Sequence, residues 1–319
     1  MRMRCPARIR LVNPTQGARI RARFRAGATG EQAFARHRSA TVHGLQPRSY
    51  LRKRGVAGGF PRCLPQKMHT ANDGIVYCSA TEHLQPETIA AAVRLLSAEE
   101  RFRLDQLVFA EDRRDFAVAH GLLRGALSAM GDSAPHEWSF VRGRGGKPAL
   151  APHVTRANLA FNLAHTRGLA ACVVANQAQV GIDVERTDIF ADVWLVAARC
   201  LSCGELEALE RVSETRRAER FIEHWVLKEA YVKATGEGLS APLDEISFAF
   251  DETSTIRFEA PHRVQPDRWQ FALYAPLPGH RLALAIQRPR RDEGLPVVKL
   301  FAHDFGEREL QPVRTSPHY

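Results

Sequence analysis

Apolar and polar positions between residues 68 and 290 follow two different periods, and each period predicts its own kind of element. Ser97 and Glu100 form a capping box, which predicts a helix running to about Val108. Apolar side chains then recur at helical spacing from Glu111 to Met130. Short apolar or alternating segments bounded by turn residues predict strands. These strands cover residues 138–141, 159–165, 168–175 and 179–185.

From residue 192 onwards the same order occurs again. The pattern is helical to about Leu209 and again from Arg216 to Thr235. Strand-like segments follow at residues 245–250, 268–275 and 281–287. Helices followed by strands therefore occur twice, which predicts an α+β fold made of two similar α/β halves in one chain. We expect these halves to cover residues 68–177 and 178–290, and residues 291–319 to form a polar, proline-containing tail.

The positive charge of the chain is confined to its first fifth. Residues 1–67 hold 16 Lys and Arg against one acid, whereas the other 252 residues hold 29 basic and 34 acidic side chains, so the total is +10. The first segment lacks a steady apolar period, and we expect a disordered Arg-rich extension. Three interpretations stay open: translated upstream sequence before a start at Met68, an organelle transit peptide, or a nucleic-acid-binding arm.

Several classes of protein do not fit the rest of the sequence. No apolar run approaches 18 residues and no secretory signal is present, so we expect a cytoplasmic protein without a membrane partner. Six cysteines in a chain of 319 residues fit reduced thiols better than a disulfide framework. Cys200 and Cys203 form one CxxC, but no second pair stands at zinc spacing, so no zinc site is expected.

Two acidic residues share one side of the strand predicted at residues 179–185. Side chains alternate along a strand, so Asp183 and Glu185 project from one face and Ile182 and Val184 from the other. Considered alone, this pattern favours a solvent-facing strand.

Glu229 and Lys233 are four residues apart on the last predicted helix, and alone they indicate a weak surface ion pair. However, Trp225 and Phe221 precede Glu229 at one-turn intervals, which places this glutamate on the packed side. A third carboxylate beside Asp183 and Glu185 becomes tenable when a hard cation such as Mg²⁺ binds among them. A lysine one turn away fits a metal-bound phosphate, so these residues indicate pyrophosphate chemistry without a P-loop or GxGxxG motif.

These residues stand within longer motifs. GIDVE (181–185) and WVLKEAYVKATGEGLSAPL (225–243), at this spacing, resemble the signature of the Sfp-type 4'-phosphopantetheinyl transferases. GKPAL (146–150), FNLAHT (161–166) and the helical stretch at residues 96–124 resemble that family as well. The resemblance covers residues 75–290 and implies the pseudo-twofold fold of the family.

The resemblance also implies a reaction. The enzyme would transfer the 4'-phosphopantetheine arm of coenzyme A to a serine of an apo acyl or peptidyl carrier protein and release 3',5'-ADP. The implied cofactor is Mg²⁺, held by Asp183, Glu185 and Glu229, with Glu229 and Lys233 as catalytic groups. Because both halves are in one chain, we expect a monomer. The sequence leaves open whether the carrier serves fatty-acid, polyketide, nonribosomal-peptide or siderophore synthesis.

Further residues match positions that meet coenzyme A in the family. The implied contacts are His165, Thr166, Lys147, Lys228, Lys233, Arg103, Arg113 and Arg114. For Lys228, support of the helix is an alternative, and for the arginines, a solvated helix face. The sequence departs from the family at Ala164, where many relatives have serine, and at Asp115, where a third arginine is frequent.

Two other functions compete with this interpretation. The first is a Mg²⁺-dependent hydrolase of coenzyme A or pyrophosphate that uses the same carboxylates. The second is a nucleic-acid-binding protein that uses the basic segment 1–67. We expect no nucleic-acid partner, and a carrier protein docked near Ile189 and Phe190.

Overall fold

The computed structural model describes residues 74–143, 146–154, 158–176, 178–190, 192–238, 241–252, 255–261, 264–287, 298–302 and 308–316. The extension expected at residues 1–67 lies outside the described residues.

The two halves contain the same series of elements. The first half consists of β1 (Gly74–Ala80), α2 (Pro86–Leu95), α3 (Ala98–Gln106), α4 (Ala110–Met130), β2 (Phe140–Arg142), β3 (Pro148–Leu150), β4 (Leu159–Thr166) and β5 (Leu169–Asn176). The second half consists of β6 (Gln179–Arg186), α5 (Val193–Cys200), α6 (Cys203–Glu210), α7 (Glu214–Thr235), β7 (Ser247–Phe250), β8 (Ile256–Glu259), β9 (Trp269–Tyr274) and β10 (His280–Gln287). Each half is thus a strand, three helices, a small hairpin and two strands.

The strand order confirms the predicted repeat. In each half the first strand pairs with the last, and the last pairs with the one before it, which gives β1-β5-β4 and β6-β10-β9. All of these pairings are antiparallel. The predicted order of helices before strands needs one correction, because a strand opens each half. The sequence pattern does not predict β1, although its segment GIVYCSA is buried along nearly its whole length.

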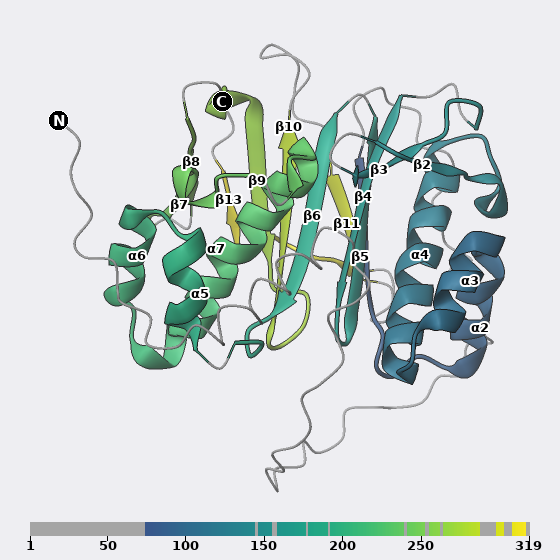
Figure 1. The fold of residues 1–319 in the computed structure, drawn as a ribbon, viewed down its shortest axis with the longest axis horizontal. Helices are drawn as coiled ribbons and strands as arrows, with labels where there is room; N and C mark the ends of the chain where they lie inside the picture. Colours follow the sequence, from purple (N-terminus) through teal and green to yellow (C-terminus); the bar gives the residue numbers. More distant parts are fainter. Residues whose placement is uncertain are drawn as a thin grey trace, which may run out of the picture.

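The two sheets lie face to face, and the helices cover their outer sides (Figure 1). Apolar side chains of both sheets, including Val173 and Ile182, meet in a shared core. Leu122 of α4 belongs to a second core on the outer face of the first sheet, and Leu227 of α7 to a third on the outer face of the second. β4 and β6 are edge strands of the two sheets, and they lie beside each other.

The prediction of a tail at residues 291–319 is wrong for three segments. β11 (Val298–Ala302) pairs in parallel with β1 and also carries β12 (Arg308–Glu309). β13 (Arg314–Thr315) pairs with β9 on the other sheet. The exposed backbone groups of an edge strand form a template for another strand, so the C-terminal segment extends both sheets. Among the described helices, none is long and apolar enough to cross a membrane.

Candidate active site

β6 presents its acidic side chains to α7. Ile182 and Val184 belong to the core between the sheets, so Asp183 and Glu185 point to the opposite face, as their alternation predicts. Gly181 lets α7 come close to this face. A Cβ atom at Gly181 would lie 2.0 Å from the carbonyl oxygen of Ala230, so no larger residue fits without moving the helix.

α7 supplies the glutamate and the lysine. The helix ends at Thr235, and the positive φ of 73° at Gly236 suits the C-cap position that follows. One turn earlier, the Lys233 ammonium donates a hydrogen bond to Asp183 Oδ1 at 2.6 Å. Trp225 lies 6.1 Å from Phe190 and 6.2 Å from Phe221, measured between ring centroids, and these contacts anchor the helix. Ile189 and Phe190 pack against the core on the outer face of the second sheet, to which α7 contributes.

Asp183 is buried and Glu185 and Glu229 are partly buried, which changes the protonation of all three carboxylates. Burial, followed by repulsion from Asp183, raises the pKa of Glu185 to about 7. The same two causes raise the pKa of Glu229 to about 7. Burial also raises the pKa of Asp183, although Lys233 opposes this shift. Three carboxyl groups therefore interact with one ammonium, so the cluster holds more acidic groups than basic ones.

The three predicted metal ligands do not surround one point. In the part of the chain that the structure describes, no group of three or more His, Cys, Asp or Glu side chains is arranged to hold a metal ion. Asp183 binds Lys233, and Glu185 accepts a hydrogen bond of 2.5 Å from Thr166 Oγ1. The metal assignment therefore stays a prediction.

β4 brings the predicted nucleotide-binding residues to the same place. Thr166 contacts Glu185 directly, and the preceding residue, His165, lies near enough to Lys233 for their charges to interact. Burial, with smaller effects from His120 and Lys233, lowers the pKa of His165 to about 4, so its imidazole is neutral at pH 7. β4 and β6 are joined at Asn162, whose Oδ1 accepts the backbone N–H of Ile182 at 2.9 Å.

Lys228 does not reach this site, so its assignment to coenzyme A needs correction. Its side chain is fully buried, and the ammonium lies 2.7 Å from Glu205 Oε2. It also donates hydrogen bonds to the carbonyl oxygens of Leu243 and Ile246, at 2.7 and 2.6 Å. Lys228 therefore joins α7 to α6 and to the segment before β7, in agreement with the structural alternative.

Lys147 is close to the site, but its ammonium is bound by the backbone. It donates to the carbonyl oxygens of Val180 and Ala234, at 2.9 and 3.1 Å. Burial lowers its pKa to about 8. Since it links the loop before β3 to both β6 and α7, Lys147 connects the two halves and is not directed towards a nucleotide in this structure.

The three predicted arginines differ in position. Arg103 pairs with Glu99 on the exposed side of α3, and Arg113 donates to the carbonyl oxygen of Leu107 at 2.8 Å. Arg114 lies 3.2 Å from the buried carboxylate of Asp115. Asp115 also accepts a hydrogen bond from the backbone N–H of Gly168, two residues after Thr166. Of the three arginines, Arg114 is therefore the one linked to the end of β4, through Asp115 and Gly168.

Local sequence patterns do not predict two sets of contacts near the site, those of Glu100 and those of Thr81. Glu100 lies 2.9 Å from His120 and 2.7 Å from the buried Arg124, and His120 in turn influences the charge of His165. Thr81 contacts Asp115 from the end of β1. These contacts join residues 20 to 34 positions apart, which local patterns do not reveal.

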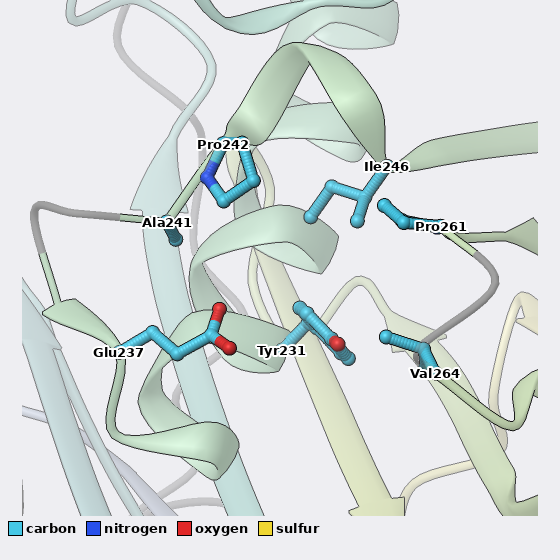
Figure 2. A pocket seen from close by; sticks show the side chains of 7 residues that line it. All are labelled: Tyr231, Glu237, Ala241, Pro242, Ile246, Pro261 and Val264. Atoms are coloured by element: carbon cyan, nitrogen blue, oxygen red, sulfur yellow. The ribbon is translucent and has the colours of Figure 1, made fainter.

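A separate small pocket lies near the C-terminal end of α7 (Figure 2). Tyr231 and Glu237 supply its polar groups, and its other lining residues, such as Pro242 and Ile246, are apolar. Among the described residues that line it, none belongs to the predicted site, so the pocket is distinct from the carboxylate cluster.

Two protein families and several known enzymes are similar to this chain in sequence. The 4'-phosphopantetheinyl transferase superfamily matches residues 179–286, and the 4'-phosphopantetheinyl transferase N-terminal family matches residues 83–178. The 4'-phosphopantetheinyl transferase HetI of Nostoc sp. is 34% identical over 176 residues, which are 55% of this chain and 74% of HetI. The 4'-phosphopantetheinyl transferase Sfp of Bacillus subtilis is 26% identical over 203 residues, which are 64% of this chain and 87% of Sfp.

Among solved structures, the holo-acyl-carrier-protein synthase of Thermotoga maritima is similar over 35% of this chain and 64% of its own, with 22% identity and a TM-score of 0.30. The match to HetI and the two family matches decide the identity. This chain is a transferase that belongs to the 4'-phosphopantetheinyl transferase superfamily.

Proposed function

We propose that this enzyme transfers the 4'-phosphopantetheine arm of coenzyme A to a serine of an apo acyl or peptidyl carrier protein. The observation that carries the proposal is the cluster of Asp183, Glu185 and Glu229 around Lys233, with His165 and Thr166 beside it. The three carboxylates can bind a cation, and Lys233, His165 and Thr166 can bind phosphate groups. Together they fit a diphosphate substrate with its cation. The named activity of HetI and Sfp supports the same reaction.

We also propose that Asp183, Glu185 and Glu229 hold Mg²⁺. Their oxygen donors are the kind that Mg²⁺ prefers, and burial with mutual repulsion raises the pKa of Glu185 and Glu229, which a bound cation would offset. When bound, Mg²⁺ would neutralise the diphosphate and polarise the phosphorus under attack.

The side chains divide the reaction among them. Glu229 takes the proton of the carrier serine as the general base. The serine oxygen forms a bond to the β-phosphorus of coenzyme A, and the bond from that phosphorus to the bridging oxygen breaks. The Lys233 ammonium stabilises the negative charge on the departing 3',5'-ADP. His165 and Thr166 bind its 3'-phosphate, and Arg114 is the best placed arginine to assist them.

The remaining properties follow from this proposal. One chain supplies β4 from the first half and β6 and α7 from the second, so a monomer is sufficient. Cytoplasmic action fits the buried free thiols of Cys172 and Cys200. The pathway of the carrier, whether polyketide, nonribosomal-peptide or siderophore synthesis, depends on a docking surface. Because Ile189 and Phe190 pack against the core of the second half, they offer at most a partly exposed part of that surface.

The direct test incubates the full chain with coenzyme A, Mg²⁺ and several apo carrier proteins, followed by intact-protein mass spectrometry. We expect one carrier to gain the mass of a phosphopantetheine group while 3',5'-ADP appears in equal amount. Absence of the gain on every carrier would refute the proposal. Cleavage of coenzyme A without a carrier would favour the hydrolase instead. Removal of residues 1–67 tests the third function, since transfer should survive while any nucleic-acid affinity is lost.

A further inference from the structure

The turn between β4 and β5 directly follows His165 and Thr166, so its position sets theirs. Thr166 pairs with Leu169 in the antiparallel ladder, which leaves a two-residue turn of Arg167 and Gly168. Gly168 has a φ of +87°, a conformation that favours glycine. Any displacement of this turn would move the end of β4 relative to the carboxylates on β6.

Asp115 holds this turn from the first half. Its side chain is on α4 and is only 3% exposed. The carboxylate accepts hydrogen bonds from the backbone N–H of Gly168, from Thr81 Oγ1 and from Arg114 Nε. Thr81 is itself fully buried, and its backbone N–H donates to the Gly168 carbonyl oxygen at 3.0 Å. Both backbone polar groups of Gly168 are thereby bound to this pair.

The second half holds the other side of the turn. His280, at the start of β10, places Nε2 3.1 Å from the carbonyl oxygen of Arg167. Thr166 binds Glu185 on β6. The turn is therefore the point where α4 of one half and β6 and β10 of the other meet, next to the proposed diphosphate site.

We propose that Asp115 is a positioning residue for the nucleotide end of coenzyme A. Through Gly168 it fixes His165 and Thr166, and through its ion pair it holds Arg114 beside the same turn. This inference rests on the proposed function, because it concerns the residues assigned there to the 3'-phosphate. A tight hairpin with a glycine in this conformation needs no buried acid to form. Burial raises the pKa of Asp115 above its usual value, so its three donors do not fully compensate for its burial.

The test compares coenzyme A with 3'-dephospho-coenzyme A, which lacks the phosphate assigned to His165 and Thr166. Asp115→Asn keeps the size of the side chain but removes its charge and one acceptor. Thr81→Val removes the hydroxyl donor at the other end of the link. Ser128→Ala is the control, because Ser128 is on the same helix and accepts a hydrogen bond of 2.8 Å from Trp138 Nε1, away from the turn. Affinity is measured by calorimetry, and KM and kcat by carrier modification.

We expect Asp115→Asn to weaken binding of coenzyme A and raise its KM by about tenfold, the effect of one lost charged hydrogen bond, with kcat within about threefold. The affinity of Asp115→Asn for 3'-dephospho-coenzyme A should differ from that of the wild type by less than about twofold. Thr81→Val should act in the same direction, and Ser128→Ala should lower only thermal stability.

An equal loss for both ligands would overturn the inference, as would unchanged affinity in folded Asp115→Asn and Thr81→Val proteins. A wild-type chain that does not distinguish the two ligands would overturn it as well. Because calorimetry needs no carrier, a wild-type chain that prefers coenzyme A but modifies no carrier would refute only the proposed transferase reaction.

Discussion

Lys233 Nζ and Asp183 Oδ1 are 2.6 Å apart, so α7 and β6 are joined by an ion pair inside the proposed site. The lysine side chain is 27% exposed and that of the aspartate 11%, so the pair is partly accessible to solvent. The proposed substrate brings phosphate groups that suit Lys233 and a cation that suits Asp183. We therefore expect this pair to separate when coenzyme A and Mg²⁺ bind.

Replacement of the ammonium tests this exchange. We expect Lys233→Met to reduce kcat/KM for carrier modification by about 10²–10³-fold, because a positive charge on the leaving group is lost. Its affinity for Mn²⁺, followed by electron paramagnetic resonance, should equal or exceed that of the wild type, since Asp183 is released. Activity near the wild-type level would show that Lys233 has no part in the reaction.

Glu185 and Glu229, both partly buried, predict an unusual dependence of stability on pH. Their pKa of about 7 in the folded protein exceeds the ordinary 4.5, so the folded state binds more protons than the unfolded state between these values. The stability they contribute is complete below pH 4.5 and is lost as pH rises through 7.

Glu229→Gln removes one of these titrations. In metal-free buffer we expect this variant to gain stability relative to the wild type between pH 5 and pH 8, by about 1–3 kcal/mol in the free energy of unfolding. Urea denaturation at the two pH values measures the difference. A constant difference across this range would contradict the raised pKa.

Divalent cations should stabilise the wild-type protein. Binding to the folded state alone adds about 2.7 kcal/mol at a concentration of one hundred times Kd, so MgCl₂ should raise Tm. Asp183→Asn should abolish the increase, and NaCl at matched ionic strength serves as the control for screening. An equal increase in the variant would place the cation elsewhere.

Lys228 should prove structural. Lys228→Met leaves Glu205 buried without its cation and removes the donor to two carbonyl oxygens, so we expect a loss of about 3–5 kcal/mol in the free energy of unfolding. Lys228→Met combined with Glu205→Gln should lose less than the sum of the single changes. At a temperature where the single variant is folded, kcat and KM should stay within about threefold of the wild type, a span below 1 kcal/mol. A large rise in KM for coenzyme A would restore its assignment to the phosphates.

The close contact at Gly181 gives a prediction with a matched control. Gly181→Ala forces α7 away from β6, so we expect a loss of about 3 kcal/mol or more in stability, together with reduced kcat as Glu229 and Lys233 move. Gly204→Ala, in α6, meets no atom within 4 Å and should be neutral or stabilising by up to about 1 kcal/mol. Differential scanning calorimetry and carrier modification measure the two effects.

Local periodicity accounts for what could be predicted from the sequence. Alternation along residues 179–185 placed Asp183 and Glu185 on one face, and the structure shows that face turned towards α7. The capping box at Ser97 marked the start of α3. The motif spacing of the resemblance identified the family, and the doubled order of elements led to the two-half fold. Each of these signals lies within a short segment or in the linear order of segments.

Contacts between distant residues were decided only by the tertiary structure. Thr166 meets Glu185, and Asn162 joins β4 to β6, because two edge strands of different sheets lie together. Lys228 turns inward since Glu205 offers it a buried carboxylate, which the motif around it does not indicate. β11 pairs with β1, where Val298 lies opposite Gly74, and β13 pairs with β9, where Arg314 lies opposite Leu273. Both pairings join segments much farther apart in the chain than any helical or strand period extends. Periodicity shows which face a side chain occupies, but the partner on that face is selected by packing and charge in three dimensions.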